Sequence, residues 1–125
     1  MTRLGELERK VMDELWSSMG TERTVREVGE HLPTHAYTTV LTVLDRLEKK
    51  GLVCRRRDGR AHRYAAVASR EEYTAELMHE ALVGSSDRDA ALVRFAETVS
   101  STEAAVLRQA LGDVSEKRVG GGGEA

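Results

Sequence analysis

A β-hairpin signal placed directly after three short amphipathic helices is the feature that most limits how this chain can fold. Asp58-Gly59 is a dipeptide typical of tight turns, and the segments 52–57 and 61–67 on either side of it have the residue types of strands. Upstream, apolar residues recur at helical spacing in three separate segments. The predicted helices cover residues 6–18, 25–32 and 36–50.

The ends of these helices are marked by residues with capping roles. Gly20 follows the first helix, and Thr24 with Glu27 forms a capping box that opens the second. Pro33 ends the second helix, and Gly51 stands at the C-terminus of the third. Two helices joined by a short turn and followed by a hairpin predict a winged helix-turn-helix. The expected fold class is therefore mainly α with a small β-hairpin wing.

The remainder of the chain has the pattern of further helices. Ser69, Ser86 and Ser100 are each placed to cap one. The first of these predicted helices begins after Ser69 and ends at about residue 84. The second covers about 87–99, and the third covers about 102–112. The last residues lose this periodicity and include four consecutive glycines, which is typical of a disordered tail. The predicted domains are a winged helix-turn-helix domain over 1–67, a helical dimerisation domain over 68–112 and a disordered Gly-rich tail over 113–125.

The net charge of −2 hides opposite charge balances in the two halves of the chain. Residues 1–67 carry 13 Lys and Arg against 10 Asp and Glu, whereas residues 68–125 carry 6 against 11. Within residues 46–63 there are eight basic side chains and two acidic ones. A basic segment ahead of an acidic half indicates one face for a polyanion and a different task for the second half.

The third predicted helix has the pattern of a DNA recognition helix. One stripe of Val and Leu residues is available for burial, which leaves a polar face for a major groove about 12 Å wide. Threonine hydroxyls near its N-terminus can bind base edges or phosphates, and Arg46 can reach a guanine or a phosphate. Asp45 also points outward. The predicted DNA-binding residues of this helix are Thr38, Thr39, Leu41, Thr42, Arg46 and Lys49.

The predicted wing adds further basic side chains. Because side chains alternate along a strand, Arg55 and Arg57 point one way and Arg56 the other. The tip around Arg60, with His62 beside it, is therefore the part expected to reach a phosphate or the minor groove. Each feature alone also has a plainer explanation, since solvated threonines, dipole-pairing lysines and edge-strand arginines are common. Their order along the chain favours DNA binding.

The C-terminal helices are expected to need a partner. Segments this short enclose little core, and small cores often depend on oligomerisation. A two-fold dimer would also present two recognition helices to two half-sites. The predicted dimerisation residues are Leu77, Met78, Leu82, Leu92, Phe95, Leu107 and Leu111. A monomeric helical cap folded on the first domain is the alternative.

Several classes of function lack their marks in this sequence. There is no G-x-S-x-G, no H-E-x-x-H and no phosphate-binding glycine loop, so we expect no enzyme and no cofactor. The single Cys54 forms neither an intrachain disulfide nor a cysteine metal site. No apolar run approaches the ~20 residues of a membrane span, and no secretory signal pattern follows Met1. We therefore expect a cytoplasmic protein without direct membrane binding.

Four runs of the sequence resemble the penicillinase repressor family of winged-helix transcriptional repressors (the BlaI, MecI and CopY repressors). They are ERKVMDELW from Glu8, YTTVLTVLDRLEKKGLV from Tyr37, RDGRAHRY from Arg57 and AALVRF from Ala90. The resemblance covers about residues 4–112. The second run corresponds to the recognition helix and its exit, so the resemblance implies DNA contacts from that helix and from the wing.

The resemblance also implies a mode of control. It implies a homodimeric repressor of β-lactam resistance genes that binds a palindromic, double-stranded operator. In the family, a membrane-bound sensor with a cytoplasmic metalloprotease domain triggers cleavage within a dimerisation helix. The matching bond is Arg94-Phe95, where staphylococcal members carry Asn-Phe. The Cys-x-Cys pairs of the copper-responsive branch are absent, so we expect no metal sensing of that kind.

Two other uses of a winged helix stay open at this point. A regulator that senses a small ligand or a metal directly needs a pocket or metal ligands between the dimer helices. The C-terminal half offers one histidine for this purpose, His79, and no cysteine. A winged helix used for protein contact needs an apolar outward face on the third helix, where Leu41 is the only large apolar residue.

Overall fold

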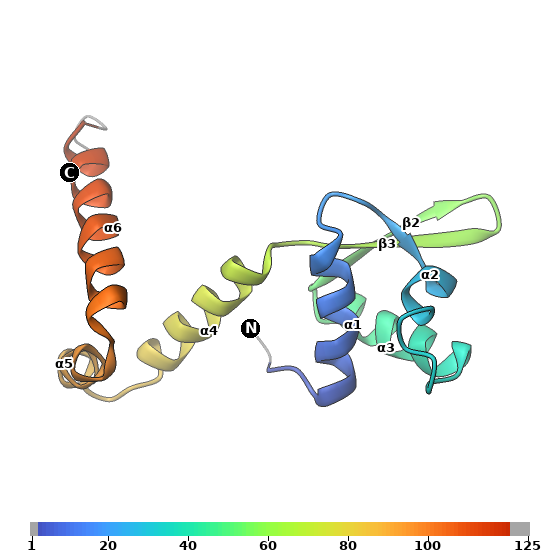
Figure 1. The fold of residues 1–125 in the computed structure, drawn as a ribbon, viewed down its shortest axis with the longest axis horizontal. Helices are drawn as coiled ribbons and strands as arrows, with labels where there is room; N and C mark the ends of the chain where they lie inside the picture. The colour runs from blue at the N-terminus through green and yellow to red at the C-terminus, as the bar shows by residue number, and fades with distance from the viewer. Residues whose placement is uncertain (1–2, 121–125) are drawn as a thin grey trace. The chain divides into compact units, whose positions relative to one another are not determined.

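The computed structural model describes the backbone of residues 3–120 and the side chains of residues 3–117. The chain divides into two compact units, Met1–Glu80 and Ala81–Ala125. The N-terminal unit contains a winged helix-turn-helix, as the sequence predicts (Figure 1). The elements in chain order are α1 (Glu6–Ser17), β1 (Arg23–Thr24), α2 (Val25–Gly29), α3 (Tyr37–Lys49), β2 (Val53–Asp58), β3 (Ala61–Ala66), α4 (Arg70–Val83), α5 (Arg88–Thr98) and α6 (Ser101–Gly120).

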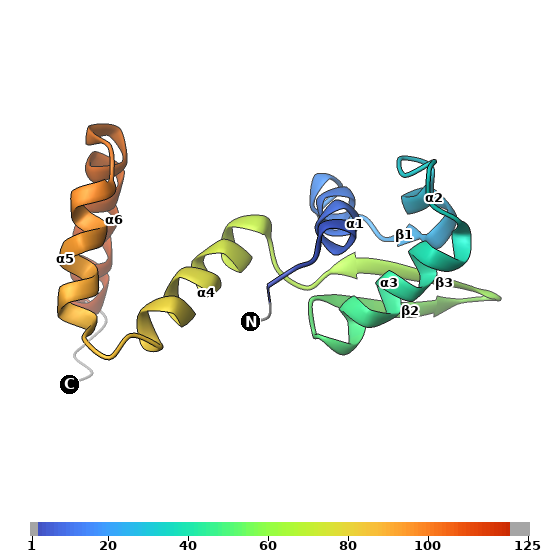
Figure 2. The ribbon, with the colours of Figure 1, turned by 90° about the horizontal axis from the view of Figure 1, so that it is seen from below.

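A hydrophobic core, mostly of aliphatic side chains, holds the first three helices against the sheet. Figure 2 shows the helices and strands of this unit from a second side. Each helix contributes a stripe of buried apolar side chains. Tyr64 of β3 closes the core from the sheet side and is fully buried. The largest fully buried aliphatic side chains are Val11, Met12, Leu15, Val28, Val40, Leu44 and Leu47.

Capping groups set the limits of α2 and α3. Thr24 Oγ1 accepts a hydrogen bond from Glu27 N at 3.2 Å, and Thr24 N donates to Glu27 Oε1 at 2.8 Å, which confirms the capping box. At the end of α3, Gly51 has a φ of +81°, and Leu52 N donates to Leu47 O at 3.0 Å. This is the Schellman arrangement, in which the residue after the C-cap has a positive φ, a conformation that favours glycine. Helix α2 ends at Gly29, three residues earlier than expected, because the following residues form a tighter turn.

The sheet has three antiparallel strands in the order β1-β3-β2. The wing is the β2-β3 hairpin, in register from Val53↔Ala66 to Asp58↔Ala61. Gly59 occupies the turn with a φ of +64°, as the Asp-Gly signal predicts. The sequence pattern did not predict β1, because a strand of two residues is too short to show an alternation.

Trp16 holds the start of α4 on the N-terminal unit. Its indole Nε1 donates to Ala68 O at 3.0 Å, and its ring lies 5.5 Å from that of Tyr73. The Arg70 guanidinium stacks over the same ring, 5.3 Å from its centroid. The division into compact units therefore falls after Glu80, inside α4. The functional division expected after residue 67 stays a prediction.

The C-terminal helices differ from the predicted ones in two details. Asp87, rather than Ser86, caps α5, since Asp87 Oδ1 accepts from Ala90 N at 3.1 Å. Helix α6 continues to Gly120, so residues 113–120 are helical where we expected a disordered tail. The continuation is polar and has no apolar stripe, which is why periodicity did not show it. The rest of the expected tail, 121–125, lies outside the described residues.

None of the helices within residues 3–120 is long and apolar enough to cross a bilayer. This observation agrees with the sequence, in which apolar residues are interrupted by charges throughout.

A half-buried ion pair joins the N-terminus of α1 to the C-terminus of α3. Glu8, at the start of α1, is 6% exposed, and its Oε2 accepts from Lys50 Nζ at 2.7 Å. Its Oε1 accepts from Gly5 N at 2.9 Å. These two bonds, the one from Lys50 above all, lower the pKa of Glu8 below its usual value. The pair therefore fixes α1 against the C-terminus of α3.

We expect this pair to make folding stability fall in acid. A carboxyl whose pKa is lowered by folding stabilises the protein above its unfolded pKa, about 4.3 for Glu. That stabilisation is lost as the pH falls below about 4.3 and through the lower folded pKa. At pH 7, Glu8→Gln is expected to reduce the free energy of unfolding by about 1.5–3 kcal/mol, the range for hydrogen bonds to charged groups. Urea unfolding between pH 3 and pH 7 measures both effects.

Glu6→Gln is the matched control, because Glu6 is an exposed acid in the same helical turn. It is expected to change stability by less than about 0.5 kcal/mol. If Glu8→Gln and the unsubstituted protein lose stability in parallel below pH 4.3, the ion pair does not contribute as described.

Candidate nucleic-acid interface

The exposed face of α3 carries the polar residues that the sequence assigned to DNA. Thr38, Thr39 and Thr42 are exposed near its N-terminus, and Arg46 and Lys49 are exposed toward its C-terminus. Small side chains at the beginning of a helix allow its backbone to approach a groove closely. This face is therefore open to a ligand as large as a duplex.

Thr42 is partly committed within the helix. Its Oγ1 donates to Thr38 O at 2.8 Å. Because that bond uses the hydroxyl hydrogen, Thr42 presents acceptor lone pairs and a methyl group to the exterior. Beside it, a shallow hollow of about 290 Å³ lies between α3 and Leu7 of α1. The hollow is lined by Leu7, Thr38, Thr39, Thr42, Val43 and Arg46.

Acidic partners occupy three of the wing arginines. Arg56 forms a two-pronged pair with Glu22, with its Nε and Nη2 atoms 2.6 to 3.0 Å from the carboxylate oxygens. Arg63 Nε donates to Asp58 Oδ2 at 2.7 Å. Each pair lowers the pKa of its carboxyl, chiefly through the hydrogen bond from the guanidinium. Arg55 lies 3.6 Å from Asp45 of α3, on the other face from Arg56, which confirms the expected alternation along β2.

Asp45 links α3 to the wing. Besides its pair with Arg55, its Oδ1 accepts from the Tyr64 hydroxyl at 3.3 Å. Burial raises the pKa of Tyr64, and the Asp45 carboxylate raises it further, so the phenol keeps its proton. The carboxylate on the outward face of α3 is thereby partly neutralised. The link also fixes the direction in which the wing leaves the helix.

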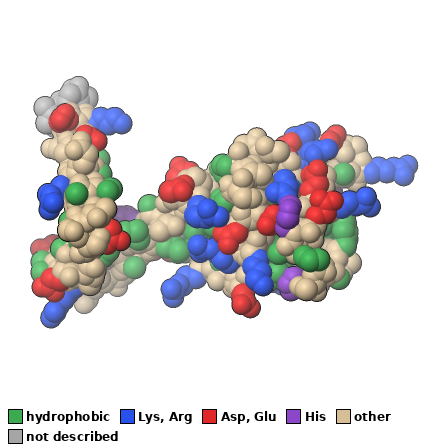
Figure 3. Space-filling view, viewed as in Figure 1, with side chains coloured by type: hydrophobic (Ala, Val, Ile, Leu, Met, Phe, Trp, Pro, Cys, Tyr) green, Lys and Arg blue, Asp and Glu red, His purple; other side chains and the backbone are tan. Residues whose placement is uncertain are grey.

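Four basic side chains of α2, α3 and the wing have no hydrogen-bond or ion-pair partner among the described residues. They are the side chains of Arg26, Arg46, Lys49 and Arg60. All four are exposed, and Lys and Arg side chains are spread over the face drawn in Figure 3. Unpaired cations beside an exposed threonine face are the composition of a surface that binds a phosphate backbone.

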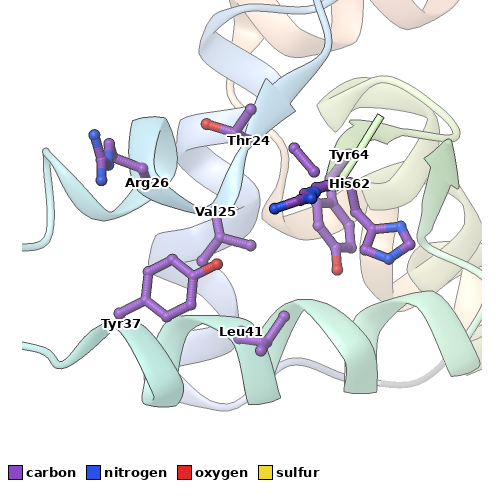
Figure 4. Close-up of a pocket in the computed structure, with 9 residues that line it drawn as sticks. Thr24, Val25, Arg26, Tyr37, Leu41, His62 and Tyr64 are labelled. Carbon is purple, nitrogen blue, oxygen red and sulfur yellow. The ribbon is translucent and has the colours of Figure 1, made fainter. Parts of the chain in front are cut away.

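A second hollow, of about 350 Å³, lies between α2, the start of α3 and the wing (Figure 4). Leu41 is half-buried on its α3 side, so it faces the wing rather than the centre of the outward surface expected for it. His62 of β3 is half-buried on the opposite side. The lining residues are Thr24, Val25, Arg26, Tyr37, Leu41, Arg60, Ala61, His62 and Tyr64.

Arg26 and Tyr37 are among the lining residues of this hollow that the sequence did not assign to the site. Arg26 is the second residue of α2, and Tyr37 is the first of α3. Their positions could have been read from the sequence, because residues that follow an N-cap lie beside free backbone N–H groups, where anions bind.

The C-terminal helices expose most of the apolar side chains that the sequence assigned to dimerisation. Leu77 and Leu82 are half-buried. The others are between 42% and 60% exposed: Met78, Leu92, Phe95, Leu107 and Leu111. The bond between Arg94 and Phe95 lies inside α5, where Arg94 Nη1 is 3.7 Å from Glu97 Oε1.

No group of three or more His, Cys, Asp or Glu side chains in the described part of the chain is placed to hold a metal ion. Cys54, the single cysteine, is exposed on β2.

Some solved structures are similar to this chain at low sequence identity. A MarR family protein from Bacillus stearothermophilus is 21% identical, with a TM-score of 0.49 over 94% of this chain and 77% of that one. FabT of Streptococcus pneumoniae, solved in complex with DNA, is 20% identical, with a TM-score of 0.47 over 90% of this chain and 74% of that one. Similarity at this level is partial.

The sequence comparisons are much closer. The chain is 53% identical over 120 residues to the protein named "Transcriptional regulator BlaI" in two strains of Mycobacterium tuberculosis, CDC 1551 / Oshkosh and ATCC 25618 / H37Rv. The match covers 91% of this chain and 86% of those proteins. The family model described as "Penicillinase repressor" matches residues 4–113. These are transcriptional regulators rather than enzymes, and the chain belongs to the penicillinase repressor family.

Proposed function

We propose that this protein is a homodimeric transcriptional repressor that places α3 in the major groove of a palindromic operator and its wing in the adjoining minor groove. The observation that carries the proposal is the distribution of charge. Acids neutralise Arg55, Arg56 and Arg63, whereas Arg46 and Arg60 stay unpaired at the two places where α3 and the wing would meet DNA.

The proposed contacts follow from side-chain chemistry. Thr38, Thr39 and Thr42 bind base edges or phosphates through short side chains. Arg46 has the length to bind a guanine or a phosphate, and Lys49 binds a phosphate. At the wing, Arg60 reaches the minor groove, where a narrow groove attracts arginine. Base contacts would set sequence preference, and phosphate contacts would set position.

The exposed apolar side chains of the C-terminal helices support dimerisation. Apolar patches of this kind are uncommon on soluble monomers and mark sites of association. Leu92 and Phe95 of α5 are three residues apart, and Leu107 and Leu111 of α6 are four apart, so the members of each pair lie on one face of their helix. A second copy of the chain offers the same apolar set, so a two-fold interface buries both. A dimer then sets the distance between two recognition helices.

We extend the proposal to the genes and the signal. The 53% identity to a protein named BlaI, and the family description, support control of β-lactam resistance genes or related genes. Release from DNA would follow cleavage at Arg94-Phe95 by a membrane-bound sensor metalloprotease. The Arg94 side chain is 85% exposed, so a protease can reach it once this part of α5 unwinds. Cleavage there would divide the apolar surface and weaken the dimer.

Substituting a free and a paired arginine tests the DNA surface. The operator is a duplex that the unsubstituted protein selects from random DNA. Arg46→Ala is expected to weaken binding to this operator by about 1–3 kcal/mol, the value for a bidentate contact between an arginine and a base. Arg56→Ala is the matched control and is expected to change affinity little, because Glu22 already occupies that side chain. Fluorescence anisotropy with the selected duplex and a random duplex measures both.

The two duplexes separate the possible roles of Arg46. Equal losses on the selected and random duplexes would assign Arg46 to a phosphate rather than a base. If Arg56→Ala weakens binding as much as Arg46→Ala, the division into free and paired arginines is wrong.

Charged substitutions on α5 test the dimer. Leu92→Asp and Phe95→Asp are each expected to yield monomers, because an unpaired carboxylate is costly in an apolar interface. Operator affinity is expected to fall with dimerisation. Val67→Asp is the control, since Val67 is equally apolar and 58% exposed but precedes the C-terminal helices. Sedimentation velocity gives the oligomeric state, and anisotropy gives the affinity; a monomer with unchanged affinity would refute the link.

A further inference from the structure

The hollow between α2, α3 and the wing lies where a DNA strand would have to pass. In Figure 4, Tyr37 and Leu41 come from α3, Val25 from α2 and His62 from the wing, around one space. In a duplex, one sugar-phosphate strand separates a major groove from the neighbouring minor groove. If α3 enters the first groove and the wing the second, that strand crosses between them. The hollow then faces the backbone and not the bases.

The charges that line this hollow are all positive. His62 is the register partner of Arg57 on β2, so both side chains are on the same face of the hairpin. Arg60 at the wing tip and Arg26 of α2 line the hollow as well. The lining residues from α3 are uncharged, Tyr37 and Leu41. No carboxylate is among the lining residues.

The carboxylates nearest in the chain are turned to other partners. Asp58, two residues from Arg60, pairs with Arg63. On α2, the Glu27 carboxylate accepts from the backbone N–H of Thr24. On α3, Asp45 binds Arg55 and Tyr64. A negative ligand in the hollow would therefore meet cations with no internal competitor.

His62 has an unmet hydrogen-bonding capacity in this place. Its Nδ1 atom is shielded from solvent and has no hydrogen-bond partner among the described residues. Buried polar atoms are normally paired, and an exception invites an explanation such as an absent ligand. A protonated imidazole donates from both nitrogens, and the natural acceptor beside a cationic cluster is an anionic oxygen.

We propose that this hollow binds one phosphate of the DNA strand between the two grooves, and that His62 holds it as the imidazolium, so that DNA binding is coupled to proton uptake. The inference rests on the proposed function, because it requires α3 and the wing to occupy adjacent grooves. It adds a property that the proposed function does not contain. The imidazolium carries a positive charge and two N–H donors whereas the neutral ring has one donor and no charge, so the contact is stronger at lower pH.

The test is the pH dependence of DNA affinity. For the unsubstituted protein, we expect affinity for the selected operator to fall about fivefold or more between pH 6 and pH 8. His62→Gln is expected to remove that dependence and to bind at pH 6 as the unsubstituted protein does at pH 8. His62→Lys keeps a positive charge across this range, so it is expected to bind tightly at both. His79→Gln, on the exposed surface of α4, is the control and keeps the full dependence.

Backbone contact and base contact are separated by a chemical change in the DNA. Replacing single phosphates by neutral methylphosphonates is expected to reveal one position in each half-site where affinity and its pH dependence fall together. The affinity of the His62→Gln variant is expected to be unchanged by the methylphosphonate at that position. The same pH dependence is expected with random duplex, since a phosphate contact carries no sequence information. Thermal unfolding at pH 6 and pH 8 confirms that each variant is folded.

The outcomes distinguish this inference from the proposed function. If His62→Gln keeps the full pH dependence, or no methylphosphonate position abolishes it, the phosphate contact of His62 is wrong. The proposed function still stands in that case, provided that Arg46→Ala weakens operator binding. If Arg46→Ala has no effect and no duplex binds better than random DNA, the proposed function itself fails.

Discussion

Burial of one face of α3 is the interaction on which the rest of the structure depends. Val40, Leu44 and Leu47 are fully buried against α1, α2 and the sheet. Burial of a side chain of this size contributes about 1.5–3 kcal/mol, so rotating the helix by even one position would cost several such terms. The fixed rotation leaves Thr38 and Thr42 on the opposite face. Hydrophobic packing therefore decides which residues can meet DNA.

Ion pairs then decide which charges are available on that surface. Glu22 and Asp58 each take one wing arginine, and Asp45 takes another while joining the wing to α3. Exposed pairs of this kind contribute little to stability. Their consequence here is to determine which arginines can bind an anionic partner. The paired guanidinium groups are already occupied, whereas Arg46 and Arg60 are free. The same neutralisation keeps carboxylates out of the hollow beside His62.

The agreement between sequence and structure is uneven for physical reasons. Helix positions and the hairpin turn were predictable because caps, glycines with positive φ and apolar periodicity are local signals. The strand Arg23–Thr24 was not, since two residues cannot display an alternation. The polar continuation of α6 was not either, because a helix without an apolar stripe resembles a tail in composition. Asp87 caps α5 in place of the adjacent Ser86, because both residue types are good N-caps and the sequence alone does not choose between neighbours.

The sequence by itself determined the order of the helices and the wing hairpin, the buried stripe of α3 and the family, because each is written in local patterns or in matching runs of residues. Only the tertiary structure decided which arginines are free, since pairs such as Arg56 with Glu22 join residues distant along the chain. It also decided that Leu41 and His62 border one hollow with Arg26. Such groupings depend on how helices and sheet pack, and packing brings together residues that no local pattern connects.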